Sequence, residues 1–305
     1  MILNYITWDF DPEIFTLGPL TIRYYGLMFA CAFLSGYLVF TRGLKIKRLD
    51  AEMLDQLLIY VAVGTIIGAR LGHCLFYEPN YYLTNPLEIL KIWEGGLASH
   101  GAAVGIVLSI WLYIRKHKLS FLWLMDRIVI VVPLGGAFIR TGNLFNSEIY
   151  GTASDLPWAF LFVRNLAHDP NTGAVIPNVP SHPTQLYEAL SYLLIFAGLF
   201  WFYRANKDKV RDGFIFGVFL IALFLARILI EFVKNDQVNF EEGMLLNMGQ
   251  WLSVPFILIG IALIIWTKQK PKYFSKTPIP KKPEKKDKNR GDAELSKAKG
   301  RAKKK

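Results

Sequence analysis

Seven apolar runs, each long enough to cross a membrane as a helix, limit what this chain can fold into more than any other feature. The runs cover residues 19–41, 54–77, 97–114, 121–140, 185–203, 213–233 and 247–267. The hydrocarbon core of a bilayer is about 30 Å thick, and a helix needs roughly 20 apolar residues to span it. With 53% hydrophobic residues, the sequence predicts an all-α integral membrane protein with about seven transmembrane helices, forming one domain over residues 1–267.

The net charge of +11 is concentrated in the last part of the chain. Residues 268–305 hold 16 Lys and Arg against 4 Asp and Glu, so the preceding residues are close to neutral. A nucleic-acid-binding protein carries its basic residues on a folded surface, and we therefore expect no nucleic-acid partner. Because residues 268–305 are rich in Lys and Pro and poor in apolar residues, they are expected to form a disordered basic tail that could bind membrane lipids.

Basic residues between the spans indicate how the chain crosses the membrane. The connections after the first, third and fifth spans contain eleven of them: Arg42, Lys45, Lys47, Arg48, Arg115, Lys116, Lys118, Arg204, Lys207, Lys209 and Arg211. The alternate connections contain three, which are Lys91, Arg164 and Lys234. Because Lys and Arg are enriched in cytoplasmic loops, we expect the N-terminus outside and the C-terminus in the cytoplasm.

One outer connection is much longer than a link between helices requires. Residues 141–184, between the fourth and fifth spans, make up 44 positions, whereas helix-to-helix links usually take about 2–8 residues. A strand is predicted at residues 158–163 and a turn at residues 169–173, where the sequence is Asp-Pro-Asn-Thr-Gly. We therefore expect a small outer, periplasmic subdomain with a hairpin that could cover a site in the membrane.

The fourth span ends in a polar cluster. Residues 135–151 read Gly-Gly-Ala-Phe-Ile-Arg-Thr-Gly-Asn-Leu-Phe-Asn-Ser-Glu-Ile-Tyr-Gly and contain Arg140, Asn143, Asn146, Glu148 and Gly151. A charge in hydrocarbon costs about 2.5–3.5 kcal/mol on insertion scales, so it marks either function or a paired structural charge. Arginine can hold a phosphate or carboxylate through two parallel hydrogen bonds. The cluster is therefore a candidate oxyanion site.

Further polar residues lie toward the outer ends of other spans. His100 is expected in the first turn of the third span, where the helix dipole disfavours imidazolium; it is either a neutral general base or a residue that fills a helix junction. Arg227 and Glu231 lie four residues apart on one helix face, which predicts an ion pair and is compatible with a functional Arg227. Three arginines, Arg70, Arg140 and Arg227, together with His100 would form an electropositive outer cavity for an anionic phospholipid. These residues alone do not separate an enzyme from a lipid transporter.

Neither cysteine suggests redox or metal chemistry. Cys31 and Cys74 lie within apolar spans, where a cysteine is usually a small buried hydrophobe. Elsewhere, no cluster of Cys, His and Asp has the spacing of a metal site. We therefore expect no metal ion and no cofactor.

Six motifs, taken together and in order, resemble the prolipoprotein diacylglyceryl transferase family. They are Tyr-Gly-Leu at 25–27, Gly-Leu-Ala-Ser-His-Gly at 96–101, Arg-x-Gly-Asn-Leu-Phe-Asn-x-Glu-x-x-Gly at 140–151, His-Pro-Thr-Gln-Leu-Tyr-Glu at 182–188, Arg-x-x-x-Glu-Phe at 227–232 and Met-Gly-Gln-Trp-Leu-Ser-Val-Pro at 248–255. The similarity covers about residues 15–267. The chain departs from the family pattern at Leu223, where a tyrosine is expected, at Leu144, where phenylalanine is more usual, and in its long basic tail.

The resemblance implies a bacterial plasma (inner) membrane enzyme. Such an enzyme takes the diacylglyceryl group of phosphatidylglycerol, places it on the lipobox cysteine of a prolipoprotein signal peptide and releases glycerol 1-phosphate. On this reading His100, Arg140 and Arg227 are catalytic, with His100 as candidate base and the arginines on the phosphate. The residues that bind and orient the substrate would be Arg140, Tyr25, Asn143, Asn146, Glu148, Gly151 and Glu231.

Two questions stay open at the level of sequence. A thiol with a pKa of about 8.5 needs activation near neutral pH, and either His100 or the field of the arginines could supply it. The rival to an enzyme is a non-catalytic anionic-phospholipid translocator or binding scaffold, which would need the arginines but no base. A second rival is an enzyme that exchanges headgroups between phospholipids.

Overall fold

The computed structural model describes residues 5–18, 20–44, 46, 49–92, 95–165, 167–168, 175–176, 178–206, 209–235 and 246–269. The predicted tail, apart from its first two residues, and the predicted turn at 169–173 lie outside these residues.

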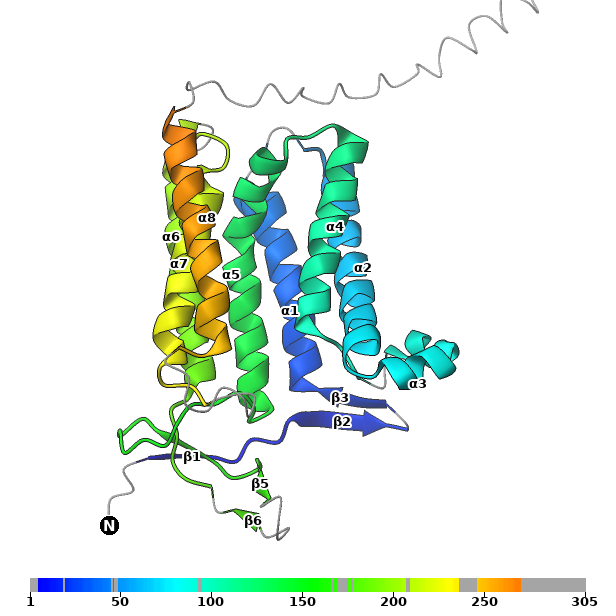
Figure 1. The fold of residues 1–305 in the computed structure, drawn as a ribbon, viewed down its shortest axis with the longest axis vertical. Helices are drawn as coiled ribbons and strands as arrows, with labels where there is room; N and C mark the ends of the chain where they lie inside the picture. Colours follow the sequence, from blue (N-terminus) through cyan, green and yellow to red (C-terminus); the bar gives the residue numbers. More distant parts are fainter. Residues whose placement is uncertain are drawn as a thin grey trace, which may run out of the picture.

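A helix occurs at each of the seven predicted spans. These helices are α1 (Tyr24–Leu38), α2 (Ala51–Phe76), α4 (Ser99–His117), α5 (Phe121–Phe145), α6 (Thr184–Asn206), α7 (Phe214–Glu231) and α8 (Met248–Gln269), and they run alongside one another in Figure 1. Within the described part of the chain, six are long and apolar enough to cross a membrane: α1 with its π-helical extension η1 (Val39–Gly43), α2, α5, α6, α7 and α8. The expectation of a mostly helical, multi-pass membrane protein is confirmed.

Helix α4 occupies the third predicted span but is less apolar than the other six. It has 19 residues, and these include His100 near its start and Arg115, Lys116 and His117 in its last turn. It packs along α2, whereas α5 packs on α1 and α6, and α7 on α8. The second span pairs with the third and the first with the fourth, so neighbours in sequence are not always neighbours in space.

Small β-structures gather at one end of the helices, which we call the strand end (Figure 1). Strand β2 (Glu13–Leu17) pairs antiparallel with β3 (Leu20–Arg23). The first span was predicted to begin at residue 19, but a strand occupies its first turn and α1 begins only at Tyr24. Leu20-Thr21-Ile22-Arg23 alternates apolar and polar residues, which suits a strand. The apolar run alone did not reveal this alternation.

The long connection between α5 and α6 contains strands β4 (Phe160–Phe162), β5 (Ala167–His168) and β6 (Val175–Ile176). Strand β4 confirms part of the strand predicted at 158–163, and its residue Phe160 also forms an antiparallel bridge with Ser181, on the far side of the predicted turn. Strand β4 pairs parallel with β1 (Ile6–Trp8) at the N-terminus, and the antiparallel pair is β5 with β6. Trp8 donates a hydrogen bond from Nε1 to the Leu144 carbonyl at 3.0 Å. The N-terminal segment thus ties the connection to the end of α5.

The end of the bundle opposite the strands contains the main buried apolar cluster. Tyr113, Leu124, Ile130 and Ile215 are almost fully buried in it, and it joins α2, α4, α5, α6 and α7. Asp126 lies at its edge and accepts hydrogen bonds from the backbone N–H groups of residues 213 and 216, at 2.7 and 2.8 Å. Asp126 therefore caps the start of α7.

Helices α2 and α4 approach each other through glycines. A Cβ atom on Gly68 would overlap the carbonyl oxygen of Gly101, and one on Gly105 would overlap the carbonyl oxygen of Gly64. Small residues at such crossings let two membrane helices pack backbone against backbone. Two smaller elements, α3 (Pro79–Thr84) and the 3-10 helix η2 (Pro86–Leu90), then lead from α2 toward α4.

This close approach can be tested by adding a single methyl group. Gly68→Ala should lower the free energy of unfolding by about 1–3 kcal/mol, because the backbone of α4 must move away. The matched control is Gly198→Ala in α6, where a Cβ atom meets nothing within 4 Å. That control should leave stability unchanged or raise it by up to about 1 kcal/mol. Thermal unfolding in detergent would measure both, and equal losses would contradict the packing described here.

Candidate active site

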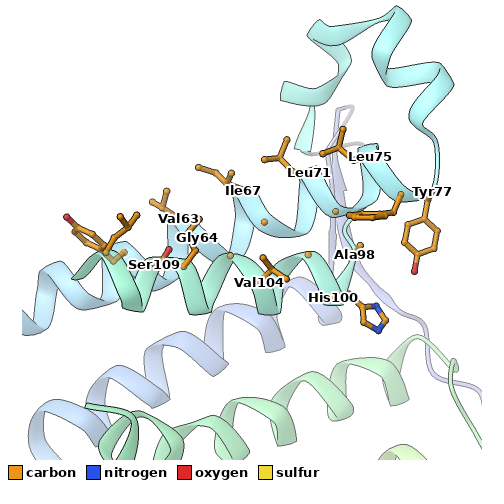
Figure 2. A pocket seen from close by; sticks show the side chains of 18 of the residues that line it. Val63, Gly64, Ile67, Leu71, Leu75, Tyr77, Ala98, His100, Val104 and Ser109 are labelled. Carbon is orange, nitrogen blue, oxygen red and sulfur yellow. The ribbon is translucent and has the colours of Figure 1, made fainter. Parts of the chain in front are cut away.

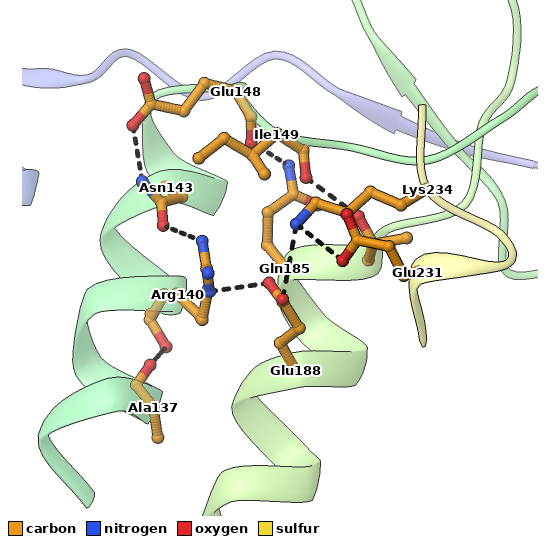
Figure 3. A network of polar contacts seen from close by, with 11 residues as sticks. Ala137, Arg140, Asn143, Glu148, Ile149, Gln185, Glu188, Glu231 and Lys234 are labelled. Carbon is orange, nitrogen blue, oxygen red and sulfur yellow. Dashed lines mark hydrogen bonds and ion pairs between the residues drawn. The ribbon is translucent and has the colours of Figure 1, made fainter. Parts of the chain in front are cut away.

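The polar residues at the end of α5 form one connected network (Figure 3). Arg140 donates from Nη1 to Asn143 Oδ1 at 3.2 Å. Asn143 in turn donates from Nδ2 to Glu148 Oε1 at 2.7 Å, and Asn146 donates to the same oxygen at 3.3 Å. Four of the residues predicted from the cluster are therefore in direct contact, because one turn of α5 and the loop after it bring them to one side.

A second branch of the network crosses to α6 and reaches past the end of α7. Arg140 Nε lies 2.7 Å from Glu188 Oε2, and Glu188 is fully buried. Lys234 Nζ lies 3.6 Å from Glu188 Oε1 and 3.7 Å from Glu231 Oε2. The expected electropositive cavity is therefore wrong in one respect: acidic residues pair with its basic ones.

Sequence reasoning missed Glu188 and Lys234 as site residues. Glu188 could have been recognised because it is an acid inside a membrane-length apolar run, and a charge in such a run is costly unless it is paired. Lys234 was grouped with the outer connections, yet only 1% of its side chain is exposed. Its position three residues after Glu231, near the end of α7, was the available signal.

The loop that carries Glu148 has a strained backbone. Ser147 and Ile149 adopt φ values of 55° and 59°, which are unfavourable for residues other than glycine, most of all for a β-branched one. The first turn of α6 holds this loop: Thr184 donates from Oγ1 to the Ile149 carbonyl at 2.9 Å, and Gln185 donates from Nε2 to the Glu148 carbonyl at 2.6 Å. Since Thr184 and Gln185 are fully buried, the loop has a rigid support on one side.

Tyr25 stands at the start of α1, beside the same network. Its hydroxyl is within electrostatic reach of Glu148 and Arg140. Gly142 makes room for its ring, because a Cβ atom there would lie 2.9 Å from Tyr25 Cδ2. The structure thus brings Tyr25 from α1 to the residues of α5.

Gly151 lies where two segments cross. It donates its N–H to the His182 carbonyl at 2.8 Å and forms a β-bridge with Lys234. A side chain at this position would overlap the Val233 carbonyl. Gly151 is required for this close approach, and direct contact with a substrate stays a prediction.

Arg227 differs from its expected arrangement. Among the described residues there is no ion pair between Arg227 and Glu231; Glu231 faces Lys234, and the backbone of Gly249 in α8 passes close to its carboxyl group. The Nε atom of Arg227 is buried and has no hydrogen-bond partner within the described ranges. A buried donor of this kind is costly unless something accepts from it, so it is available to an anionic ligand.

Arg70 does not join the other two arginines. Its guanidinium donates to the carbonyl groups of four residues, 88, 89, 95 and 96, at 2.6–3.3 Å. Gly95 and Gly96 have φ values of 90° and 68°, and the side chain of Arg70 is buried beneath them. The expectation that Arg70 lines the anion site is wrong, because its donors hold the segment before α4.

His100 lies in the first turn of α4, as predicted, but apart from the network. Its side chain is exposed, and no hydrogen bond or ion pair among the described residues joins it to Arg140 or Arg227. It stands at one end of an apolar groove of about 930 Å³ along the α2–α4 pair, lined by Ile67, Leu71, Leu75, Val104 and Leu108 among others. Figure 2 shows the imidazole pointing away from α2 at that end.

Known proteins resemble this chain over most of its length. A family model described as prolipoprotein diacylglyceryl transferase matches residues 12–266. A relative from Tolumonas auensis is 48% identical over 259 residues, which are 85% of this chain and 96% of the relative. Relatives from Chloroherpeton thalassium and Porphyromonas gingivalis are 43% and 46% identical over 265 and 277 residues, which are 86% and 88% of this chain and 94% and 96% of the relatives.

All three relatives carry the name phosphatidylglycerol–prolipoprotein diacylglyceryl transferase. The matched residues include the network of Figure 3, five of the six membrane-length helices in full, and α8 up to residue 266. On these grounds the chain belongs to the prolipoprotein diacylglyceryl transferase family.

Proposed function

We propose that this chain transfers the diacylglyceryl group of phosphatidylglycerol to the thiol of a lipobox cysteine in a prolipoprotein and releases glycerol 1-phosphate. Family membership and the names of the relatives support this activity. The position of Arg140 links this activity to particular residues. Arg140 is held between Asn143 and Glu188 at the end of a membrane-length helix. That is a fixed cation where a phospholipid headgroup would lie.

The chemistry needs a site for growing negative charge. The cysteine sulfur forms a bond to the terminal carbon of the diacylglyceryl group, and the bond from that carbon to the phosphate oxygen breaks. Glycerol 1-phosphate leaves with the electron pair, and the thiol loses its proton. Preorganised donors aimed at the departing oxyanion lower the barrier, and we assign this role to Arg140 and Arg227. The Nε atom of Arg227 has no hydrogen-bond partner in the described part of the chain.

The residues around Arg140 are proposed to orient the headgroup. Asn143 and Asn146 both donate to Glu148, so the carboxylate is held in a single place. Glu148 can then accept from a glycerol hydroxyl of phosphatidylglycerol, while Tyr25 faces it from α1. Glu231, through Lys234, helps set the charge around Glu188.

His100 is proposed to take the thiol proton. Its exposed imidazole at the start of α4 is accessible to a peptide. The apolar groove that ends at His100 offers a surface for acyl chains. In this arrangement the lipid and the peptide meet between the start of α4 and the end of α5.

We also propose a location for the whole chain. The positive-inside bias supports a bacterial inner-membrane protein with the strand end outside and the segment from residue 268 in the cytoplasm. On this view residues 1–267 form the catalytic membrane domain, and residues 141–184 form an outer subdomain above the site.

The function is tested by incubating the purified chain with phosphatidylglycerol and a peptide containing a lipobox cysteine. Mass spectrometry should show a gain of one diacylglyceryl unit on the peptide together with free glycerol 1-phosphate. A peptide with serine in place of cysteine is the control and should not react, since the hydroxyl is a far weaker nucleophile. An unchanged cysteine peptide would reject the proposed function in favour of a translocator or scaffold.

Arg140→Lys should fold but lose about 10²-fold or more in transfer. Lysine keeps the charge, but its ammonium cannot reproduce the planar guanidinium that contacts Asn143 and Glu188 while it offers a donor to phosphate. The control is Arg164→Lys in an exposed ion pair with Asp9 and Asp11, which should transfer at the parent rate. Near-native transfer by Arg140→Lys would rule out a geometric role for the guanidinium.

His100→Gln should bind phosphatidylglycerol normally and lower turnover by about 10²–10⁴, the usual contribution of a general base. His117→Gln, at the other end of α4, provides the control and should keep the parent turnover. Turnover would be measured from roughly pH 6 to 9, across the range where a histidine and a thiol titrate. If the His100 variant keeps the parent rate throughout this range, the arginines activate the thiol.

Orientation can be tested by labelling single cysteines in intact cells, in a chain with Cys31→Ala and Cys74→Ala. The exposed residue Asp155 lies in the long connection, and the exposed residue Lys116 lies at the opposite end of the bundle. An impermeant thiol reagent should label Asp155→Cys and not Lys116→Cys. The reverse pattern would overturn the orientation and with it the outer location of the site.

A further inference from the structure

Tyr192 lies one turn of α6 after Glu188, which belongs to the network described above, and none of the proposed roles uses it. It follows Glu188 by four residues on α6, so both side chains are on one face of the helix. Only 7% of Tyr192 is exposed. A tyrosine buried in a membrane-length helix needs a partner for its hydroxyl.

The Tyr192 ring lies among residues that come one helical turn before Arg140 in α5 and Arg227 in α7. It packs in a buried cluster with Ala137 of α5 and Leu223 of α7. Ala137 precedes Arg140 by three residues, and Leu223 precedes Arg227 by four. Gly136 makes room for the ring as well, because a Cβ atom there would lie 2.9 Å from Tyr192 Cδ2. The ring therefore has one defined place between α5, α6 and α7.

Helix geometry directs the hydroxyl toward the arginines. Long side chains on a helix lean toward its N-terminus, and α6 begins at the strand end with Thr184. Helices α5 and α7 end there, so Arg140 and Arg227 lie closer to the strand end than Ala137 and Leu223 do. The Tyr192 hydroxyl accordingly lies within electrostatic reach of Glu188, Arg140 and Arg227.

We infer that Tyr192 is a positioning residue for the transfer reaction. Its hydroxyl lies on the side of the site nearer the membrane interior, and it holds the guanidiniums of Arg140 and Arg227 in place for the departing phosphate. The inference rests on the proposed function. The hydroxyl can accept from one guanidinium and donate its own hydrogen to Glu188 or to a phosphate oxygen. Because charge grows on the phosphate only as the bond breaks, misplaced guanidiniums reduce kcat more than they weaken lipid binding.

The test is Tyr192→Phe, which keeps the packed ring and removes the hydroxyl. We expect kcat for diacylglyceryl transfer to fall about 10–100-fold, the loss that one hydrogen bond to a charged group accounts for. KM for phosphatidylglycerol should stay within about threefold of the parent, since ground-state binding is retained. The matched control is Tyr113→Phe in α4, which removes the hydroxyl of another buried tyrosine, one that donates to the Met53 carbonyl at 2.9 Å. That control should lose some stability and keep the parent kcat.

A second variant separates the hydroxyl from the packing. Leu223 of α7 packs against the cluster that contains the ring, and it is one of the positions at which the chain departs from the family pattern. Adding Leu223→Tyr to Tyr192→Phe places a hydroxyl in the same region from the opposite helix, and it should recover most of the lost kcat. Recovery would support positioning by the hydroxyl, because a purely structural defect would not be repaired in this way.

Two outcomes would overturn the inference. One is a Tyr192→Phe variant with kcat within twofold of an active parent. The other is a Tyr192→Phe variant that loses kcat, unfolds at a lower temperature than Tyr113→Phe, and does not recover kcat when Leu223→Tyr is added. An inactive parent chain would instead reject the proposed function, so the two failures are distinguishable.

Discussion

The ion pair between Arg140 and Glu188 is the interaction on which the arrangement of the site depends. It joins α5 to α6 with 2.7 Å between the charged atoms, and neither oxygen of Glu188 accepts a hydrogen bond from the described residues. The acid is therefore held by charge. Removing one partner of such a buried pair leaves the other uncompensated, at a cost of about 3–5 kcal/mol. Each residue consequently fixes the other, and with it the distance between the two helices.

The rest of the site is built outward from this pair. Asn143 and Glu148 extend it along α5 and into the strained loop, and Lys234 extends it toward α7. Basic and acidic groups alternate along these contacts, so the resting site is nearly neutral overall. A phosphate that enters would add negative charge beside guanidiniums already held in place, with little rearrangement of the surrounding protein. Such preorganisation is what an enzyme needs when charge develops during the reaction.

The helices could be predicted because an apolar run of about 20 residues has few alternatives in a membrane protein. The pairing of β1 with β4 could not, because these strands have three residues each and lie far apart in the chain. Arg140, Asn143, Asn146 and Glu148 were predictable as a group, since they lie within nine positions of one another. Glu188 and Lys234 were not, because burial and pairing across α5, α6 and the end of α7 are properties of the fold. Arg70 was misjudged for a related reason: its partners are backbone carbonyl groups, which every sequence contains and no motif marks.

The parallel pairing of β1 with β4 has a consequence for biosynthesis. Ile6 is paired with Phe160, so the first strand leaves the ribosome long before its partner exists. At about 5–20 residues per second, the delay between the two is on the order of ten to thirty seconds. During that time the membrane-length helices α1, α2 and α5 must be inserted, and the N-terminal segment waits with unpaired backbone groups. The strand end is therefore completed only after much of the bundle has been inserted, which makes its closure a late step in the maturation of the protein.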